Sequence, residues 1–108
     1  MKRVDTTAMA DLIARCFDLA MDGRVPQRQR TALLAAGKRL REDLVTLLAA
    51  QFDDGTAEVD AANKSLAAVN EALQASAADL GKLGRTLEKI ARVVAAIDKL
   101  IPAIAKNV

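Results

Sequence analysis

The side chains that could carry out covalent or acid–base chemistry are few and scattered in this sequence. The 108 residues include no histidine and a single cysteine, Cys16. Histidine is the commonest general base, so the Ser–His and Cys–His nucleophile arrangements and histidine-bearing metal sites are all absent. Cys16 stands in helical phase with Met9 and Leu12, and we expect it to pack as a small hydrophobic side chain rather than react as a thiolate.

Two glycine-containing segments resemble ligand-binding loops only superficially. Residues 80–84 (LGKLG) have neither the spacing of a phosphate-binding loop nor a preceding strand. Residues 53–55 (DDG) are too short for a calcium loop, lack its later ligands, and instead predict a tight turn. The acids are spread over helix faces and caps. We therefore expect no enzymatic activity, no catalytic, cofactor-binding or metal-binding residues, and no cofactor.

The composition predicts which elements must position any functional side chain. Apolar residues make up 52% of the chain and aromatic residues only 2%, with no Trp or Tyr. An apolar fraction made of Ala, Leu, Val and Ile suits closely packed helices rather than a sheet sandwich. Two prolines and five glycines leave room for few turns. A chain of this length forms one domain, so we expect an all-α domain over 1–108.

The first expected helix covers about 7–21, where apolar residues recur at helical spacing. Thr6 or Thr7 suits its N-cap, because a hydroxyl can accept from the free N–H groups of the first turn. Gly23 follows its end, where glycine can adopt the left-handed conformation that terminates many helices.

The second and third helices are expected at about 26–52 and 56–101. Pro26 suits a first helical position because its fixed φ is already helical. Gly37 lies within the apolar stripe of the second helix, and its lack of a side chain would let a neighbouring helix come close. Thr56 is the expected cap of the third helix.

Residues 59–108 keep one heptad register in which every core position except Ser76 is apolar. This spacing is typical of helices that wind around partners. The favoured architecture is an elongated helical hairpin or bundle whose C-terminal helix is continuous for about 69 Å. The alternative is a compact four-helix bundle with a turn at Gly81–Gly84 and Thr86 as the cap of a fourth helix. The register favours the continuous helix, because a turn usually resets the hydrophobic phase.

A continuous third helix would leave its C-terminal stripe overhanging the second helix. An apolar stripe of that length exposed to water calls for a cover. We expect either a second copy of the chain or a helical protein partner to bury it, and we expect Ile90→Asp to dissociate that assembly. The predicted interface residues are Leu80, Leu83, Leu87, Ile90, Val94, Ile97, Ile101 and Ile104.

The net charge of +2 is small, but the charges occur in blocks. Segment 24–41 has six basic residues and no acid, 53–79 has six acids and one base, and 82–106 has six bases and two acids. Such blocks can set the direction in which helices pair, or can simply form solvated faces. Antiparallel pairing of the second and third helices would bring Lys38 close to Glu71.

The predicted function is non-enzymatic protein–protein interaction or self-assembly through the C-terminal stripe. One alternative is a membrane-surface or lipid binder, because 80–108 has an apolar face with cations opposite. Another is DNA binding through the basic 24–41 segment, although its cations spread around the helix without aromatics, which disfavours a nucleic-acid partner. No secretory signal or membrane-length apolar run is visible. We therefore expect a cytoplasmic protein. A substrate of a secretion system that needs no signal peptide would show the same features.

Overall fold

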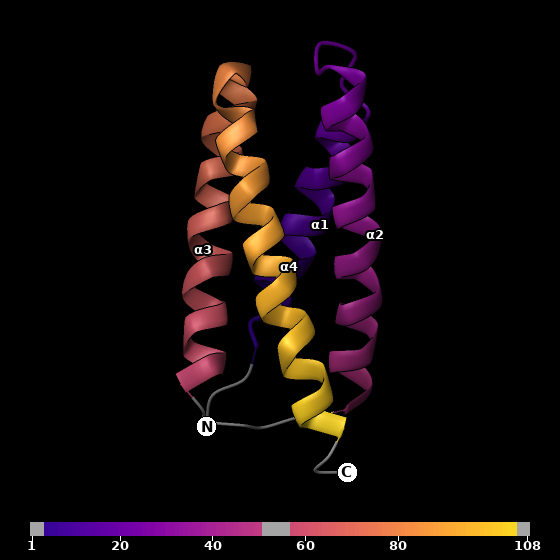
Figure 1. Ribbon diagram of the computed structural model, residues 1–108, viewed down its shortest axis with the longest axis vertical. Helices are drawn as coiled ribbons and strands as arrows, with labels where there is room; N and C mark the ends of the chain where they lie inside the picture. Colours follow the sequence, from indigo (N-terminus) through magenta and orange to yellow (C-terminus); the bar gives the residue numbers. More distant parts are fainter. Residues whose placement is uncertain (1–3, 51–56, 106–108) are drawn as a thin grey trace.

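Four helices stand side by side along one axis (Figure 1). The computed structural model describes residues 4–50 and 57–105, and within these ranges it contains helices but no strand. The all-α prediction is therefore confirmed. The elements are α1 (Thr6–Ala20), α2 (Gln27–Ala50), α3 (Ala57–Ala78), the 3-10 turn η1 (Leu80–Lys82) and α4 (Leu83–Ala105).

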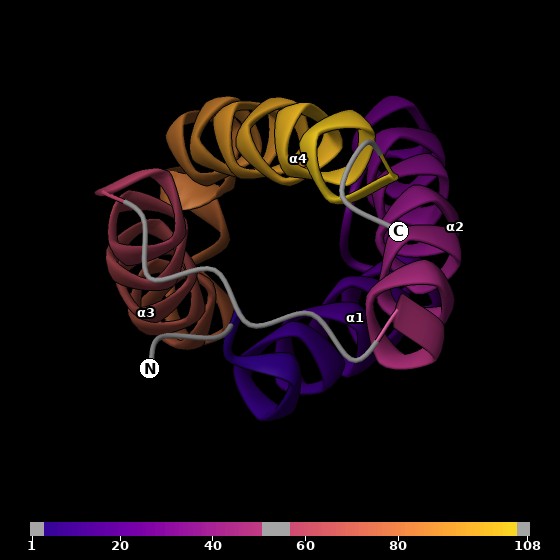
Figure 2. The same ribbon diagram turned by 90° about the horizontal axis from the view of Figure 1, so that it is seen from below.

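The helices occupy the corners of a square, in the order α1, α2, α4, α3 around the bundle (Figure 2). α1 and α3 run in one direction and α2 and α4 in the other (Figure 1). Two hydrogen bonds join the parallel neighbours α1 and α3: Asp5 N–H donates to Asn63 Oδ1 at 2.7 Å, and Asn70 Nδ2 donates to the Ala8 carbonyl at 3.0 Å. α1 and α4 lie diagonally opposite, as do α2 and α3. The expected pairing of Lys38 with Glu71 is therefore wrong.

One apolar core lies at the centre of the square, and every helix contributes residues to it at helical spacing. Burying a Leu, Ile or Met side chain contributes about 1.5–3 kcal/mol relative to leaving it in water, so this shared core is the main stabilising term. The largest fully buried side chains include Met9, Leu12, Leu33, Leu40, Leu66, Leu73, Leu83, Ile90 and Ile97.

The helix ends near the N-terminus differ in detail from the sequence prediction. Asp5, rather than Thr6 or Thr7, is the N-cap of α1, and its carboxylate accepts from the Ala8 N–H at 3.0 Å. Gly23 does not adopt the left-handed conformation. The turn is held instead by Asp22, whose carboxylate accepts hydrogen bonds from the backbone and side chain of Arg24.

α2 and α1 approach closely at Gly37, as the sequence predicted. A Cβ atom at Gly37 would stand 2.8 Å from Cε1 of Phe17, which is closer than real carbon atoms pack. The ring of Phe17 is also covered by Arg41, whose guanidinium carbon lies 5.9 Å from the ring centroid. Gly37 thus gives up about 1 kcal/mol of helix propensity and makes room for an aromatic ring between the two helices.

The continuous C-terminal helix is the main prediction that the structure corrects. α3 ends at Ala78 and α4 begins at Leu83, so the chain adopts the four-helix alternative. Asp79 makes the break: its backbone is extended (φ −139°, ψ 95°), and its carboxylate accepts from the Gly81 N–H at 3.1 Å. The Lys82 N–H donates to the Asp79 carbonyl at 3.1 Å and closes the turn.

The buried stripe changes its heptad positions at the turn. Both predicted core positions are buried in α3, whereas in α4 one predicted set is buried (Leu83, Ile90 and Ile97) and is joined by Val93 and Leu100, which the register had placed outside the core. Leu83 begins α4 fully buried, and Leu80 in the 3-10 turn packs partly buried against the same cluster. The connection therefore reverses the chain and also rotates the apolar stripe, so that Val93 and Leu100 are buried while Leu87 and Val94 are only partly buried. Thr86, the expected cap, lies one turn inside α4 and is buried.

The predicted interface residues are part of the internal core wherever their side chains are described. Leu83, Ile90 and Ile97 are fully buried, and the partly buried ones pack against the same cluster: Leu80, Leu87, Val94 and Ile101. The Ile104 side chain lies outside the described residues, as do the predicted turn at 53–55 and the cap at Thr56. The longest dimension is 44 Å, against about 69 Å for a continuous helix, so the overhang that motivated an intermolecular stripe is absent.

Candidate functional site

The single cysteine of the chain is placed where its thiol is shielded. Cys16 is fully buried, and desolvation raises the pKa of its thiol to about 12, so the reactive thiolate is suppressed. No cluster of three or more potential metal-ligating side chains occurs among the residues that the structure describes.

Two adjoining cavities lie between α3 and α4 in the described part of the chain. The first, of about 270 Å³, is lined by Ala72, Ala75, Lys82, Arg85, Thr86 and Lys89. The second, of about 150 Å³, is lined by Ser65, Ala68, Val69, Lys89, Arg92 and Val93. Lys89 lines both, so the two cavities are successive stretches of one depression along the helix pair. We call this depression the basic groove.

One bank of the basic groove carries four cations, the first at the end of η1 and the other three on α4. Lys82, Arg85, Lys89 and Arg92 follow one another at spacings of three, four and three residues, and this spacing places them on one side of a helix. All four are exposed. None of the four forms an ion pair with an acid in the described part of the chain. The ion pairs found there are made by Arg24 and Arg39.

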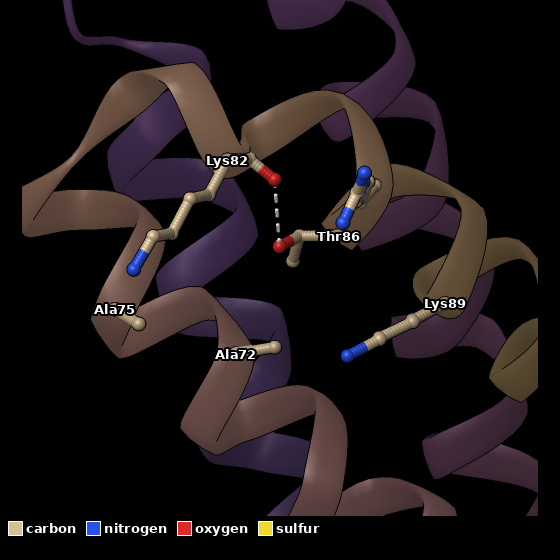
Figure 3. A pocket seen from close by; sticks show the side chains of 6 residues that line it. Ala72, Ala75, Lys82, Thr86 and Lys89 are labelled. Carbon is tan, nitrogen blue, oxygen red and sulfur yellow. Dashed lines mark hydrogen bonds between the residues drawn. The ribbon is translucent and has the colours of Figure 1, made fainter.

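The α3 bank is built from small side chains. Ser65, Ala68, Ala72 and Ala75 recur at the same three- and four-residue spacing as the cations opposite. Because none of them extends beyond Cβ or Oγ, the space beside the cations stays open. Figure 3 shows the ammonium groups of Lys82, at the end of η1, and of Lys89, on α4, reaching toward α3 near Ala75 and Ala72.

A pair of buried hydroxyl groups lies at the base of the wider cavity. Ser76 Oγ and Thr86 Oγ1 are 2.7 Å apart and join α3 to α4. Each also lies within hydrogen-bonding distance of the carbonyl four residues back in its own helix, Ala72 O at 2.9 Å and Lys82 O at 3.2 Å. Both hydroxyl protons are donated within these three hydrogen bonds, so neither hydroxyl has a proton left to donate to an anion. An anion in the groove would be held by the cations.

The other basic segment, 24–41, is less available. Arg24 bonds Asp22 at 2.7 Å, Arg39 bonds Asp98 of α4 at 3.2 Å, and Arg41 lies over Phe17. The hydrogen bond from Arg24 lowers the pKa of Asp22 to about 2. These contacts occupy half of the cations on which a DNA-binding surface would depend.

A carboxyl pair occupies the seam between α2 and α4. Asp43 is only 5% exposed, and burial followed by a hydrogen bond with Asp98 raises its pKa to about 7. The same hydrogen bond, together with Arg39, lowers the pKa of Asp98. Asp43 Oδ2 has no hydrogen-bond donor among the described residues, which suits a carboxyl group that carries its own proton. This pair affects stability rather than recognition, because it is largely covered.

Sequence reasoning noticed the cations of the basic groove but assigned them to the polar face opposite an intermolecular stripe. Their position beside a row of small α3 residues depends on the turn at Asp79, which reverses the chain and places α3 against α4. The sequence signal was available: an aspartate two residues before a glycine is a common start of a turn.

Over the described ranges, no helix combines the length and apolar character needed to cross a membrane. Comparison with known proteins gives no match to a protein family, to a curated protein or to a solved structure.

Proposed function

We propose that this protein is a non-enzymatic interaction module that binds an acidic helix in the basic groove between α3 and α4. The observation that carries the proposal is the row of four exposed, unpaired cations beside a bank of small side chains. Cations that form no ion pair within the chain can attract acidic partners and speed their encounter. Small residues allow a partner's backbone to approach closely.

A helix is the form of partner that matches this geometry. The two banks repeat every seven residues, Lys82 with Lys89 and Arg85 with Arg92 on one side, Ser65 with Ala72 on the other. A helix laid along the groove presents side chains at the same intervals, so acids seven residues apart would meet successive pairs of cations.

The two alternative functions find less support in the described residues. No aromatic side chain lines either cavity, so the bases of a nucleic acid would have nothing to stack on. A lipid surface would need the apolar face of α4, and its residues Leu83, Ile90 and Ile97 are buried in the core. Binding a membrane through that face would require the bundle to open.

Titration with a synthetic helical peptide tests the proposal. The peptide carries glutamates at heptad spacing on one face, and a matched peptide carries lysines there instead. We expect the acidic peptide alone to bind, to shift the amide resonances of Ala72, Lys82 and Lys89 in NMR spectra, and to bind more weakly as salt is added.

The variant Lys89→Glu/Arg92→Glu should weaken peptide binding by about tenfold or more, since several exposed charge pairs are lost and repulsion replaces them. The matched control is Arg28→Glu/Lys38→Glu, which changes the net charge equally on the exposed surface of α2. Equal weakening by both variants would show only a general charge effect and would contradict a specific groove.

A further inference from the structure

The outer face of α1 has the opposite character to the basic groove. Its most exposed line consists of Thr7, Asp11, Ala14 and Asp18, which recur at spacings of four, three and four residues. We call this line the acidic ridge. It combines two carboxylates with small side chains, and neither carboxylate has an ion-pair partner in the described part of the chain.

The acidic ridge and the basic groove share one repeat. Asp11 and Asp18 are seven residues apart, as are Lys82 and Lys89, and Arg85 and Arg92. On a helix, seven residues span about 10 Å. Two carboxylates on the ridge can therefore face two pairs of cations in the groove at the same time.

These two surfaces cannot meet within one molecule. α1 and α4 stand at diagonal corners of the bundle, and their outer faces point away from each other (Figure 2). The bundle is therefore electrically asymmetric across its diagonal, with carboxylates on the outside of α1 and cations on the outside of α4.

We propose that the acidic ridge of one copy docks in the basic groove of a second copy, and that successive copies join head to tail. This inference rests on the proposed function, since it names the helix that the groove binds. The contact is heterologous: each copy uses its ridge toward one neighbour and its groove toward another. Such contacts do not close on a two-fold axis, so they generate chains of copies.

Charges at the borders of the contact are compatible with this docking. Arg15 flanks the acidic ridge between Asp11 and Asp18, and the exposed acids Glu71 and Glu88 lie on the helices that form the groove. The cation beside the ridge, Arg15, could therefore pair with an acid beside the groove, Glu71 or Glu88. Because the carboxylates of the ridge and the cations of the groove are exposed, the contact is weak and is screened by salt.

The test measures solution mass by light scattering over a dilution series, at low and at high salt. The unmodified chain should rise above 11.5 kDa with concentration at low salt and return toward 11.5 kDa at high salt. Two variants disable one surface each: Asp11→Lys/Asp18→Lys on the ridge and Lys89→Glu/Arg92→Glu in the groove. Each should weaken self-association by about tenfold or more.

The deciding step is an equimolar mixture of the two variants. Each variant alone opposes like charges, whereas the mixture again offers a carboxylate-bearing ridge to a cationic groove, so association should return. Circular dichroism checks that both variants fold, which their exposed positions favour. A chain that stays at 11.5 kDa throughout, or that associates equally well in either variant, would overturn the inference. If copies stay apart while the acidic peptide still binds the groove, self-docking fails and the proposed function stands.

Discussion

The carboxyl pair at the α2–α4 seam shows how a single residue can make this bundle sensitive to pH. Asp43 is buried against Asp98, which itself accepts both hydrogen bonds from Arg39 Nε at 3.2 and 3.3 Å. Arg39 offers one positive charge to the two carboxyl groups, Asp43 and Asp98. The buried one, Asp43, therefore keeps its proton to a higher pH than a free aspartate. Glu42, 3.9 Å from Arg39, adds negative charge and further favours protonation of Asp43.

The unfolding free energy should therefore fall as pH rises from about 4 to about 7. In this interval folded Asp43, with a pKa of about 7, keeps a proton that the unfolded chain, at 3.8, has released. The pKa of Asp98 is lowered in the folded chain, so its ionised carboxylate stabilises the fold at pH values above the ordinary aspartate pKa. This stabilisation is lost only as the pH falls below that pKa, outside the interval from pH 5 to pH 8. We expect a loss of roughly 2 kcal/mol between pH 5 and pH 8, measured by urea unfolding.

Asp43→Asn is the informative variant, because the amide stays neutral and can still donate to Asp98. It should abolish most of the slope between pH 5 and pH 8 and should raise stability at pH 8. The control is Asp22→Asn, since the pKa of Asp22 is already lowered to about 2 and that carboxylate stays charged throughout this range. A slope that persists in Asp43→Asn would mean that another group controls it.

At the scale of elements, sequence patterning located the helices well and the connection between two of them poorly. The bounds of α1 and α2 lie within a few residues of those expected, because their apolar periodicity and flanking Gly23 and Pro26 are local signals. The break between α3 and α4 was missed, because Leu80 in the 3-10 turn and Leu83 at the start of α4 keep the heptad spacing of the sequence across it. A heptad register reports which face is buried; it does not report the direction in which the next helix runs.

The turn at Asp79 depends on a side-chain cap and not on glycine flexibility. Neither Gly81 nor Gly84 has a positive φ, whereas the Asp79 carboxylate accepts from the Gly81 N–H. Asp79→Ala should therefore lower the unfolding free energy by about 1 kcal/mol, the usual effect of removing a cap. Gly84→Ala is the matched change: its added Cβ meets nothing within 4 Å, and alanine should stabilise α4 by about 0.5 kcal/mol.

Both values can be read from urea denaturation followed by circular dichroism at 222 nm. If Asp79→Ala were neutral while Gly84→Ala were destabilising, the glycines and not the aspartate would define the connection. The result bears on the basic groove as well, because this connection holds the cations of α4 beside the small residues of α3.

For the whole molecule, the fold converts a stripe expected between molecules into the core within one molecule. Leu83, Ile90 and Ile97 are fully buried among residues from the other helices. The exposed surface includes a cationic side on α4 and a carboxylate-bearing side on α1, besides exposed apolar side chains such as Val45 and Leu48 on α2. Composition alone predicted the helices, but which side chains stay outside depends on how the chain reverses.

Ile90→Asp separates the two architectures. In the bundle, this change removes a core side chain that is 1% exposed and places a carboxylate there without a partner. Losing the packed side chain alone costs about 2–5 kcal/mol, and the buried charge adds to this. A domain of this size is stable by about 5–15 kcal/mol, so we expect Ile90→Asp to lose most of its helical signal and its cooperative melting. The control is Lys89→Glu/Arg92→Glu, on the exposed side of the same helix, which should keep both the helical signal and the cooperative melting.

The contrary outcome would be a well-folded Ile90→Asp monomer from a parent chain that associates. The stripe would then be an interface between molecules, and the internal core would be contradicted.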